Sequence, residues 1–419
     1  MPQVKPEVEA FARIKVIGCG GSGKNATNHM INSKVRGVDF IAVNTDSQDL
    51  HNSLSKKKIH IGKNLTRGLG TGMNPELGKR AAEETKEEIQ NSLKGADMVF
   101  IACGMGGGTG SGSAPVVAQV AKDLGILTVA VVTKPFSFEG TQRNKIADTG
   151  LSELKKSVDA LIVIPNDRLL QTVSRDTSAQ NAFAMCDEVL KQAVEGISDL
   201  ITTPGIINID FADIRAVMEN AGPALMGVGV ATGEKRAEEA ARLAINSPLL
   251  DISINGARGV LFSIAGGDDL GMLEIQDAAK VITESIDPEA KVIFGTVRDD
   301  RLKKGSVKVT VIASGFPEPS VYKASTTNSL LSFQRGDLSQ ALPKEEPARG
   351  RIYNTQEPIT TPIAQSFSAV ETQVSRVEIE AEPEVVSVSN DESKKIIIDD
   401  TQDDDWGAVP AFLRRSKLK

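Results

Sequence analysis

The chain has 419 residues, 40% of them hydrophobic, which is enough for two or three globular domains of about 150 residues each. Its formal net charge of −7 disfavours a protein whose main surface binds nucleic acid, because such surfaces carry an excess of Lys and Arg. No apolar run is long enough to span a membrane, and the polar first residues lack the apolar stretch of a secretory signal. The sequence therefore predicts neither a membrane span nor export.

The cysteines and histidines predict neither a disulfide framework nor a metal site. The cysteines are odd in number, form no C-x-x-C pair and lie in apolar or glycine-rich surroundings, which is typical of small buried residues in a reducing cytosol. The histidines lack the spacing of metal ligands. These residues are Cys19, Cys103, Cys186, His29, His51 and His60.

The first half of the chain, from Arg13 to Pro165, alternates short strand-like runs with longer helical patterns such as residues 75–93. The runs are nearly continuous in apolar and β-branched residues, which is typical of strands buried on both faces. Strands that alternate with helices form a parallel sheet with helices on both sides, so we expect an α/β domain here. The predicted strands are residues 13–17, 38–43, 96–102, 126–132 and 159–164.

A glycine-rich stretch follows the first predicted strand and satisfies two phosphate-binding patterns. In IKVIGCGGSGKNATNH, Gly18, Gly20 and Gly23 form the G-x-G-x-x-G fingerprint of dinucleotide sites, whereas Gly18, Gly23 and Lys24 form most of a P-loop. A P-loop places Ser or Thr directly after its Lys to bind magnesium, and Asn25 stands there instead. The P-loop interpretation is therefore weakened.

The dinucleotide interpretation requires an acidic residue about twenty positions further on, at the end of the second strand, where it would bind a ribose. Asp46 roughly fits that place. A tight strand-to-helix turn without a ligand remains an alternative for a single pattern of this kind.

A second glycine-rich stretch, Gly104 to Gly112 (GMGGGTGSG), lies between a buried strand and a predicted helix at residues 113–124. So many glycines leave main-chain N–H groups uncovered, and a helix N-terminus favours an anion, so this stretch predicts a site for a chain of phosphates. Both glycine-rich loops should lie at the same edge of one sheet and hold the phosphates from opposite sides. Neither dehydrogenases nor P-loop enzymes are built in this way.

One helical pattern continues from Ala179 to Thr202 and predicts a long, buried spacer helix. Three helical and three strand patterns follow it, which indicates a smaller α+β domain that packs against this helix. The apolar positions of the long helix are Phe183, Val189, Leu190, Val194, Ile197 and Leu200. The later helices are residues 211–220, 234–245 and 271–285, and the later strands are residues 258–266, 290–297 and 307–315.

Beyond residue 316 the periodic patterns fade, and Ser, Thr, Glu, Gln and Pro dominate. Such a composition buries too little apolar surface to offset the entropy of ordering, so we expect a disordered linker over residues 317–399. The last residues, DDDWGAVPAFLRRSKLK, differ from the linker because they combine the only Trp with an apolar cluster and a basic end.

Taken together, the motifs resemble those of a known family. GGGTGSG resembles the tubulin signature, and IKVIGCGGSGKNATNHM, VNTDSQDL, GLGTGMNPELG, TKPFSFEGTQR, NIDFAD and ARGV occur in the order found in the bacterial FtsZ family, the tubulin-like cell-division GTPases. The match covers residues 12–316 and the C-terminal peptide, but not the linker.

The resemblance implies an α/β, tubulin-like fold with a parallel-sheet nucleotide-binding domain, a long central helix, a smaller α+β C-terminal domain and a disordered tail. The implied parts are a disordered N-terminus (1–12), a GTP-binding domain (13–178), the central helix (179–202), the C-terminal domain (203–316), the linker (317–399) and a partner-binding peptide (400–419).

By the same resemblance, GTP or GDP binds with Mg²⁺ at the glycine-rich loops. Members of the family usually carry glycine where this chain has Ser22 and Lys24, so Lys24 either adds a charge near the phosphates or points to solvent. Asn74 and Pro75 also fit a plain helix start. The implied GTP-binding residues are Gly20, Gly21, Ser22, Gly23, Lys24, Asn25, Asn44, Asp46, Gly72, Met73, Asn74, Gly106, Gly107, Gly108, Thr109, Gly110, Glu139, Arg143, Asn166, Phe183 and Asp187.

Two pairs among these residues have a structural alternative. Glu139 is implied at the ribose and Arg143 near the nucleotide, but the two could instead form a surface ion pair. Phe183 and Asp187 lie one turn apart on the long helix, so an aromatic plane and a carboxylate could meet the same base. A carboxylate accepts from the N1–H and N2–H₂ groups of guanine, whereas adenine has no matching pair of donors. The alternative is a core aromatic residue beside a solvated helix charge.

NIDFAD contains Asn208, Asp210 and Asp213, which the resemblance implies as catalytic residues. Taken alone, it fits a helix start with Asp210 as the N-cap. In the family this loop enters the nucleotide site of the next subunit and positions water and a cation for attack on the γ-phosphate. The resemblance thus implies a self-assembling GTPase that forms head-to-tail filaments and hydrolyses GTP between subunits. A nicotinamide-dependent oxidoreductase and a non-hydrolysing scaffold of the same fold are the alternatives.

The resemblance also implies a cytoplasmic homo-polymer at the mid-cell division ring, without a nucleic-acid partner or a membrane span. Its C-terminal peptide is implied to bind membrane-tethering division adaptors. The alternatives are a disordered end that aids solubility and a basic end that contacts anionic lipid directly. The implied partner-binding residues are Trp406, Val409, Pro410, Phe412 and Leu413.

Overall fold

A computed structural model describes residues 12–171, 177–203, 205–247, 254, 256–299 and 301–316, all of which belong to one compact unit. Within these ranges no helix is long and apolar enough to cross a membrane. The predictions for the first eleven residues, the linker at 317–399 and the peptide at 400–419 lie outside the described residues. The same holds for Trp406, Val409, Pro410, Phe412 and Leu413.

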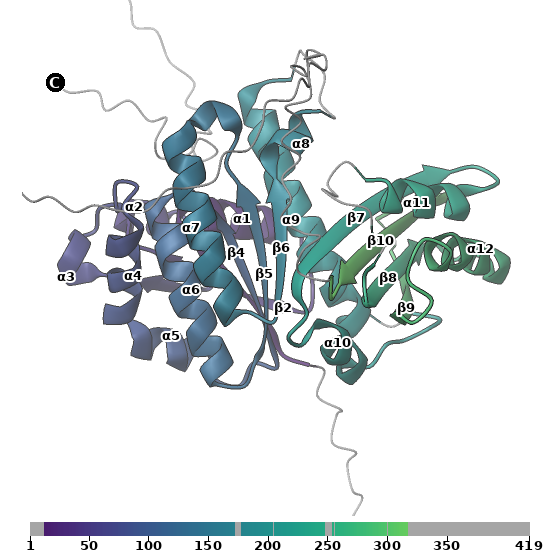
Figure 1. The fold of residues 1–419 in the computed structure, drawn as a ribbon, viewed down its shortest axis with the longest axis horizontal. Helices are drawn as coiled ribbons and strands as arrows, with labels where there is room; N and C mark the ends of the chain where they lie inside the picture. The colour runs from purple at the N-terminus through teal and green to yellow at the C-terminus, as the bar shows by residue number, and fades with distance from the viewer. Residues whose placement is uncertain are drawn as a thin grey trace, which may run out of the picture. The chain divides into compact units, whose positions relative to one another are not determined.

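One ten-stranded sheet runs through the unit in the order β3-β2-β1-β4-β5-β6-β7-β10-β8-β9 (Figure 1). The first six strands in this order are all parallel, and the five of them that were predicted from apolar runs form the expected parallel sheet. These strands are β1 (Ile14–Cys19), β2 (Val38–Asn44), β3 (Lys57–His60), β4 (Met98–Gly104), β5 (Leu127–Lys134) and β6 (Ala160–Pro165).

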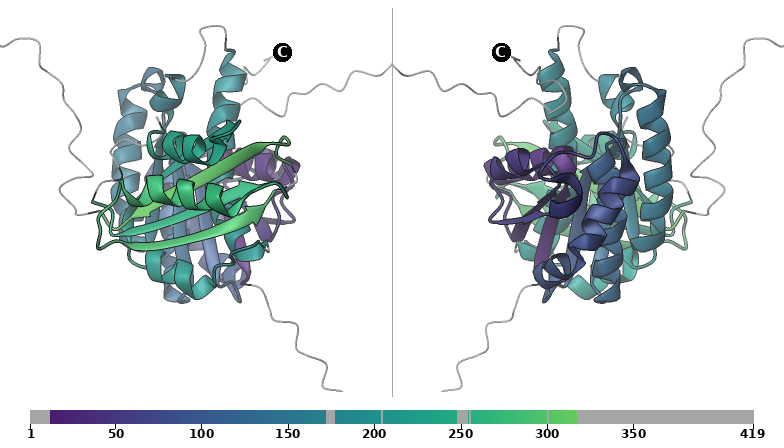
Figure 2. Two further views of the ribbon diagram at one scale, coloured as in Figure 1. Left: turned by 90° about the vertical axis from the view of Figure 1, so that its right-hand side faces the viewer. Right: turned by 90° about the vertical axis from the view of Figure 1, so that its left-hand side faces the viewer.

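Helices cover both faces of the parallel strands, and a separate apolar core lies on each face (Figure 2). On one face, α1 (Gly20–Asn32) and α9 (Ala179–Thr202) pack against β1, β4, β5 and β6. On the other face lie α4 (Pro75–Glu84), α5 (Lys86–Leu93), α6 (Gly108–Asp123) and α7 (Thr141–Ser157). The remaining elements of this half are α2 (Ser47–His51), α3 (Lys63–Thr66), a 3₁₀ turn η1 (Ser137–Glu139) and α8 (Asn166–Leu170).

The long helix has the predicted bounds, since α9 spans Ala179–Thr202 and 24 residues. At 1.5 Å per residue it is about 36 Å long, which is longer than the parallel strands it packs against, since the longest of them spans about 27 Å. Its side chains at Val189, Leu190 and Ile197 are buried in the core on that face, as expected for a buried spacer helix.

Strands β7 (Gly222–Thr232), β8 (Gly259–Gly266), β9 (Lys291–Arg298) and β10 (Ser306–Ser314) complete the sheet. Strand β10 is antiparallel to both of its neighbours, β7 and β8. Helices α11 (Arg236–Ile245) and α12 (Met272–Thr283) close a third core over these strands, and α10 (Phe211–Met218) joins the core around α9. This half is the predicted α+β region, but its sheet is continuous with the first through a three-residue ladder between β6 and β7.

Three expectations from the sequence need correction. Residues 75–93 form two helices rather than one, because the β-branched Thr85 departs from helical geometry and accepts a hydrogen bond from Gly62 N. Strand β3 has only four residues at the sheet edge and was not predicted. Strand β7 was also missed, because Gly227 and Gly229 interrupt its apolar pattern. A Cβ atom at either glycine would collide with main-chain atoms of α11, so the helix lies directly on the strand there.

Candidate functional site

A cavity of about 840 Å³ lies where β1, β4 and β5 end, at the carboxyl edge of the parallel strands. In an open α/β sheet this edge is where ligands bind. The cavity brings together sixteen of the twenty-one predicted GTP-binding residues. They are Gly20, Gly21, Ser22, Lys24, Asn25, Gly72, Met73, Gly107, Gly108, Thr109, Gly110, Glu139, Arg143, Asn166, Phe183 and Asp187.

Both glycine-rich stretches begin helices at the cavity. Helix α1 starts at Gly20 and α6 starts at Gly108, and neither N-cap side chain accepts a hydrogen bond from the helix. The first-turn N–H groups are therefore left for a ligand, and the helix dipole favours an anion there. The two stretches touch each other, because a Cβ at Gly20 would lie 2.9 Å from Gly110 N. This geometry suits a chain of phosphates held between two helix N-termini.

A third loop, residues 67–74, closes the cavity beside the second stretch. Thr71 Oγ1 lies 3.2 Å from Thr109 Oγ1, which lies 2.9 Å from Thr45 Oγ1, so three buried hydroxyl groups connect three loops. A Cβ at Gly108 would overlap Thr71 Oγ1 and lie 2.6 Å from Asn74 N. Asn74 itself caps α4 by accepting a hydrogen bond from Leu77 N, as predicted for a helix start.

Phe183, Asp187 and Asn166 line the part of the cavity beside α9. The Phe183 ring meets the buried Phe136 ring edge to face, with 5.4 Å between centroids. Burial raises the pKa of the Asp187 carboxyl group to about 7, although the charges of His29 and Lys24 oppose the shift.

Asn166 is 5% exposed, and its Oδ1 atom has no hydrogen-bond partner among the described residues. A buried polar atom without a partner is costly unless a ligand or water supplies a hydrogen bond. An aromatic edge, a carboxyl group and a free amide oxygen therefore suit a flat base that carries donors. Phe183 and Asp187, predicted to lie on one face of α9, do share this wall of the cavity.

Glu139 and Arg143 form the ion pair of their structural alternative, but this pair lies in the cavity wall. Arg143 Nη1 lies 3.2 Å from Glu139 Oε2, and Glu139 Oε1 accepts a hydrogen bond from Phe136 N at 3.1 Å. The pair is therefore held in place beside the cavity rather than loose on the surface.

Lys24 does not point to solvent. Its side chain is 2% exposed, and its ammonium group lies 2.8 Å from Asp49 Oδ1. The second oxygen of Asp49 accepts a hydrogen bond of 2.8 Å from Asn44 Nδ2. Asn44 is therefore a buried support behind the cavity wall, and Asp46 is the N-cap of α2, accepting from Asp49 N at 3.0 Å.

Five predicted residues lie outside the lining of the cavity. Asn44, Asp46 and Asn74 act as supports and helix caps, as described above. Gly23 is there for packing, because a Cβ would collide with Ala102 O of the neighbouring strand. Gly106 has a φ angle of 95° and lies against the main chain of Arg143, so it permits a turn rather than lining the site.

Several lining residues were not predicted from the sequence. Asn28, His29 and Asn32 follow Asn25 on α1 at helical spacing, so the periodicity of this polar face was an available signal. His29 Nε2 lies 2.9 Å from Glu188 Oε2 on α9. No local pattern marked the others, because separate segments bring them to the cavity; they include Asp49, Asn52, Thr71, Thr133 and Gln180.

The NIDFAD residues lie away from the cavity. Asn208, Asp210 and Asp213 are exposed, and none of them lines it. Asp210 is the N-cap of α10, as its structural interpretation predicted. Just after α10, Asn220 N donates to Asp159, the residue before β6. The NIDFAD segment therefore lies toward the amino edge of the parallel strands, opposite the cavity.

The described residues contain no group of three or more His, Cys, Asp or Glu side chains that could enclose a metal ion. Mg²⁺ does not need such a cage, because it keeps several waters and usually binds one or two carboxylates together with substrate phosphates. A site without such a group therefore still fits Mg²⁺ that arrives on a bound polyphosphate. All three cysteines are buried and free, as predicted.

Residues 13–174 match the GTPase domain of the Tubulin/FtsZ family, and residues 222–317 match the C-terminal domain of the FtsZ family. An empty FtsZ dimer from M. jannaschii shows 47% sequence identity and a TM-score of 0.71, covering 74% of this chain and 89% of that chain. GDP-bound CetZ1 from Haloferax volcanii shares the fold at 24% identity, with a TM-score of 0.63 and coverage of 73% and 94%. The chain therefore belongs to the FtsZ family of tubulin-like GTPases.

Proposed function

We propose that this FtsZ-family GTPase binds GTP in the cavity, assembles head to tail, and hydrolyses GTP only where the NIDFAD segment of one subunit meets the cavity of the next. One observation carries the proposal. The cavity lies at the carboxyl edge of the parallel strands, whereas Asp210 and Asp213 lie toward the amino edge. These carboxylates cannot reach a nucleotide in their own subunit, so they can act only on another copy.

The nucleotide is oriented by the two ends of the cavity. The phosphates bind the N–H groups of the first turns of α1 and α6, and Thr109 adds a hydroxyl group. The base lies beside Phe183 and donates from its N1–H and N2–H₂ groups to Asp187. The Oδ1 atom of Asn166, which has no partner among the described residues, accepts a hydrogen bond from the same base. Adenine has no matching pair of donors and would leave at least one Asp187 oxygen unpaired, so the site selects guanine.

Hydrolysis depends on positioning rather than on covalent catalysis. Asp210 and Asp213 of one subunit orient a water molecule against the γ-phosphate bound by the next subunit, and Asn208 holds the loop by accepting from Gly205 N at 2.7 Å. Magnesium on the phosphates would neutralise part of their charge. The exposed carboxylates of the NIDFAD segment, which carry no ion pair among the described contacts, would be the protein groups that hold it.

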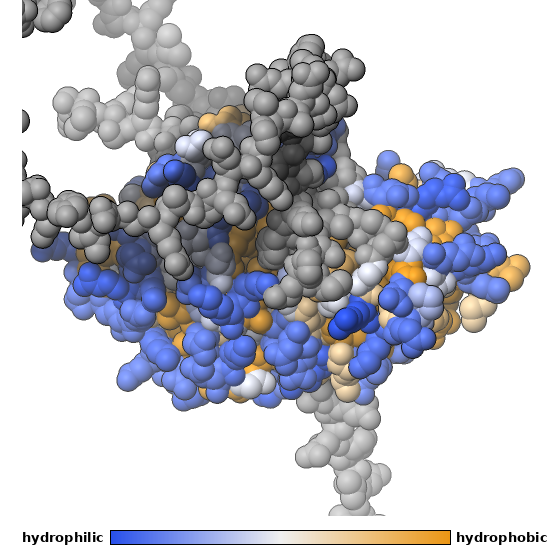
Figure 3. All heavy atoms as spheres, viewed as in Figure 1, coloured by the Kyte–Doolittle hydropathy of each residue, from blue (hydrophilic) through white to orange (hydrophobic). Residues whose placement is uncertain are grey.

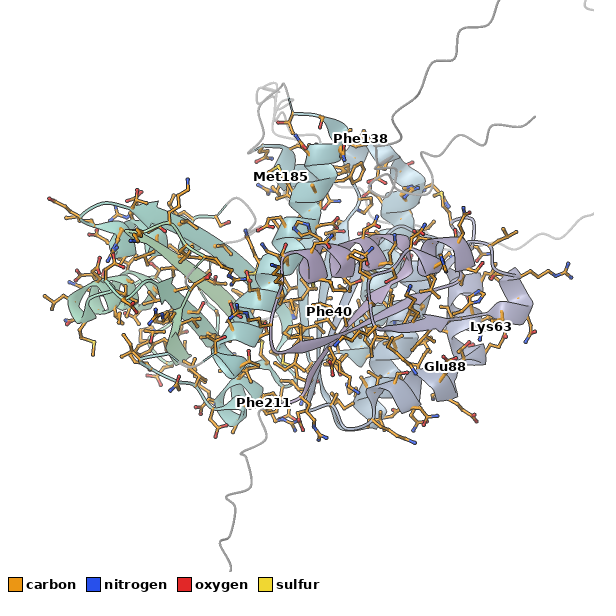
Figure 4. The ribbon with its side chains drawn as sticks, turned by 180° about the vertical axis from the view of Figure 1, so that it is seen from behind. Phe40, Lys63, Glu88, Phe138, Met185 and Phe211 are labelled. Carbon is orange, nitrogen blue, oxygen red and sulfur yellow. The ribbon has the colours of Figure 1, made fainter. Side chains whose placement is uncertain are left out.

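The two edges also offer apolar contacts for such assembly. Leu69 in the third loop and Phe138 beside the cavity are 70% and 69% exposed, and Ile206, just before NIDFAD, is 70% exposed. In Figure 4 the labelled Phe138 and Phe211 lie at opposite ends of α9. Figure 3 shows hydrophilic residues over much of one face, although Met272 and Leu273 of α12 are also exposed, at 67% and 75%. A contact between unlike ends does not close on itself, so it builds a filament.

A subunit-mixing assay tests this function. Asp210→Asn keeps a capping oxygen for α10 but removes the charge, and Gly108→Ser blocks the nucleotide cavity by overlap with Thr71. Each variant alone should release phosphate from GTP at least about a hundredfold more slowly than the wild type. The mixture should regain activity, because an intact NIDFAD segment can then face an occupied cavity.

Glu219→Gln, at the other end of α10, is the matched control and should retain full turnover. Phosphate release by dilute, strictly monomeric protein at the rate of the polymer would exclude a shared site. At the level of the cell, we propose that such filaments form the cytoplasmic division ring at mid-cell and that residues 400–419 tether them to membrane-bound adaptors.

A further inference from the structure

A buried ion pair forms part of the cavity wall next to the first glycine-rich stretch. Lys24 of α1 and Asp49 of α2 both line the cavity, and their charged atoms lie 2.8 Å apart. Their side chains are only 2% and 6% exposed, so solvent screens neither charge strongly. Removing one member would therefore leave a nearly unscreened charge at the site.

The carboxylate of this pair has a fixed position. Asp49 Oδ2 accepts a hydrogen bond of 2.8 Å from Asn44 Nδ2, while Oδ1 faces Lys24. The same Oδ2 atom lies 3.6 Å from where a Cβ of Gly21 would stand. Gly21 belongs to the first turn of α1, whose N–H groups are open to a ligand. Asp49 thus holds a negative charge beside the anion-binding end of α1.

Such a carboxylate would repel a polyphosphate in the absence of a compensating cation. Coulomb repulsion between two charges a few ångströms apart is strong where the effective dielectric constant is low. Lys24 cancels the charge of Asp49 and leaves the wall neutral. An ammonium group has three N–H donors, so Lys24 can hold Asp49 and still turn a donor toward a ligand.

We propose that the Lys24–Asp49 pair is a determinant of phosphate affinity, in which Lys24 acts by neutralising Asp49 so that the first glycine-rich stretch accepts the charge of a di- or triphosphate. The pair thereby sets how strongly the site prefers GTP and GDP over GMP and guanosine. This inference rests on the proposed binding of phosphates at α1.

Binding of four ligands that differ only in phosphate number tests the pair. Guanosine, GMP, GDP and GTP are titrated by calorimetry into the full-length protein without divalent cations, so that the phosphate charge is not masked and GTP persists. Lys24→Met should weaken GTP binding at least about tenfold, GDP less and guanosine hardly at all. Asp49→Asn should have the opposite effect on affinity: it should strengthen the binding of GTP most and of guanosine least.

The double variant Lys24→Met/Asp49→Asn removes both charges and should return the ratio of GTP to guanosine affinity close to that of the wild type. Lys308→Met is a matched control, because Lys308 lies 3.5 Å from the buried Glu195 outside the cavity. It should leave the ratio unchanged. Thermal unfolding establishes that each variant is folded. If Lys24→Met does not fold, the change in GTP affinity of Asp49→Asn alone tests the proposal.

Two outcomes separate this inference from the proposed function. If the wild type binds none of the four ligands, the proposed GTP site is wrong. If the wild type binds GTP but Lys24→Met loses the same factor for guanosine as for GTP, the pair only supports the wall, and its electrostatic role is excluded. An Asp49→Asn variant that binds GTP more weakly would exclude it equally.

Discussion

At Asp187, burial in the cavity wall raises the pKa of the carboxyl group to about 7. The unfolded chain ionises this carboxyl group near its ordinary pKa of about 3.9. Between these values the folded state holds the proton that the unfolded state has lost, so the stability contribution of Asp187 falls as the pH rises. The full penalty for the buried charge is present above pH 7, in the absence of nucleotide.

Asp187→Asn should therefore stabilise the nucleotide-free protein at pH 8 and have little effect below about pH 4. The amide has a similar shape but carries no charge at any of these pH values. Thermal unfolding of both proteins over this pH range measures the difference. An equal change in melting temperature at every pH would show that burial of the ionised carboxyl group does not destabilise the folded protein.

Guanine binding should depend on pH in the opposite direction. Only ionised Asp187 can accept from both donor groups of guanine, so GDP affinity should fall by up to about tenfold per unit as the pH decreases below 7. In Asp187→Asn this dependence should disappear, together with much of the preference for GTP over ATP. Titration of GDP into both proteins cancels the ligand's own ionisation. Unchanged selectivity in the variant would remove Asp187 from the base site.

Gly108 is a second residue whose role is set by its neighbours. A Cβ there would overlap Thr71 Oγ1, so Gly108→Ala should displace the third loop and weaken GTP binding by about tenfold or more. Gly70→Ala in the same loop is the control, because a Cβ at Gly70 meets no atom within 4 Å. Nucleotide affinity measured by fluorescence titration distinguishes them. A folded Gly108→Ala protein with wild-type affinity would contradict the close packing of these loops.

At the scale of elements, a group of charges joins α9 to the second half of the sheet. Glu195 of α9 is 3% exposed and lies 2.7 Å from Arg301 Nη1 and 3.5 Å from Lys308 Nζ. Arg301 also pairs with Asp299, at 2.8 Å. Burial, together with the negative charge of Glu195, raises the pKa of Asp199 to about 6. The cations therefore hold together carboxylates that would otherwise repel one another.

Arg301→Met should destabilise the protein by about 2 kcal/mol or more, because Glu195 loses its nearest cation while it stays buried. Adding Glu195→Gln should recover part of this loss. Arg298→Met, at an exposed pair with Asp268, should cost less than about 1 kcal/mol. Urea denaturation measures all three variants. If Arg301→Met and Arg298→Met lower the free energy of unfolding equally, the buried charge group stabilises the protein no more than a surface ion pair does.

At the scale of the whole molecule, α9 connects the two edges that carry the proposed sites. Phe183 and Asp187 near its start line the cavity, whereas Thr202 at its end lies against Gly37, just before β2. The helix therefore runs from the carboxyl edge of the parallel strands to their amino edge. Any shift of α9 along its axis would move residues at both edges, and so would reach both neighbours in the proposed filament.

The C-terminal peptide should act independently of this core. Removing residues 400–419 should leave GTP binding, hydrolysis and filament formation in solution largely intact, because none of the described cavity or edge residues belongs to it. It should abolish recruitment to a bilayer coated with the membrane-tethering adaptor, and Phe412→Ala should reproduce much of that loss. Co-sedimentation with such vesicles measures recruitment. Normal binding by the truncated protein would disprove the docking role.

Local patterns alone determined much of this protein. The bounds of α9 and the strands β1, β2, β4, β5 and β6 followed from periodicity, because a helix or a buried parallel strand needs only the right spacing of apolar residues. The glycine-rich stretches at Gly20 and Gly108 were recognisable as candidate anion sites for a similar reason. A main-chain cradle is made by a few consecutive residues, and glycine marks it directly.

The tertiary structure alone decided where single side chains act. Lys24 could have faced phosphate or solvent, and it is buried because Asp49, from another helix, lies 2.8 Å away. Thr71 touches Thr109 although 38 positions separate them. Strand β7 forms because β10 pairs with it along most of its length and α11 packs onto its glycines. Such contacts join segments that are distant in the sequence. A local pattern carries no information on which distant segment will pack against a given residue.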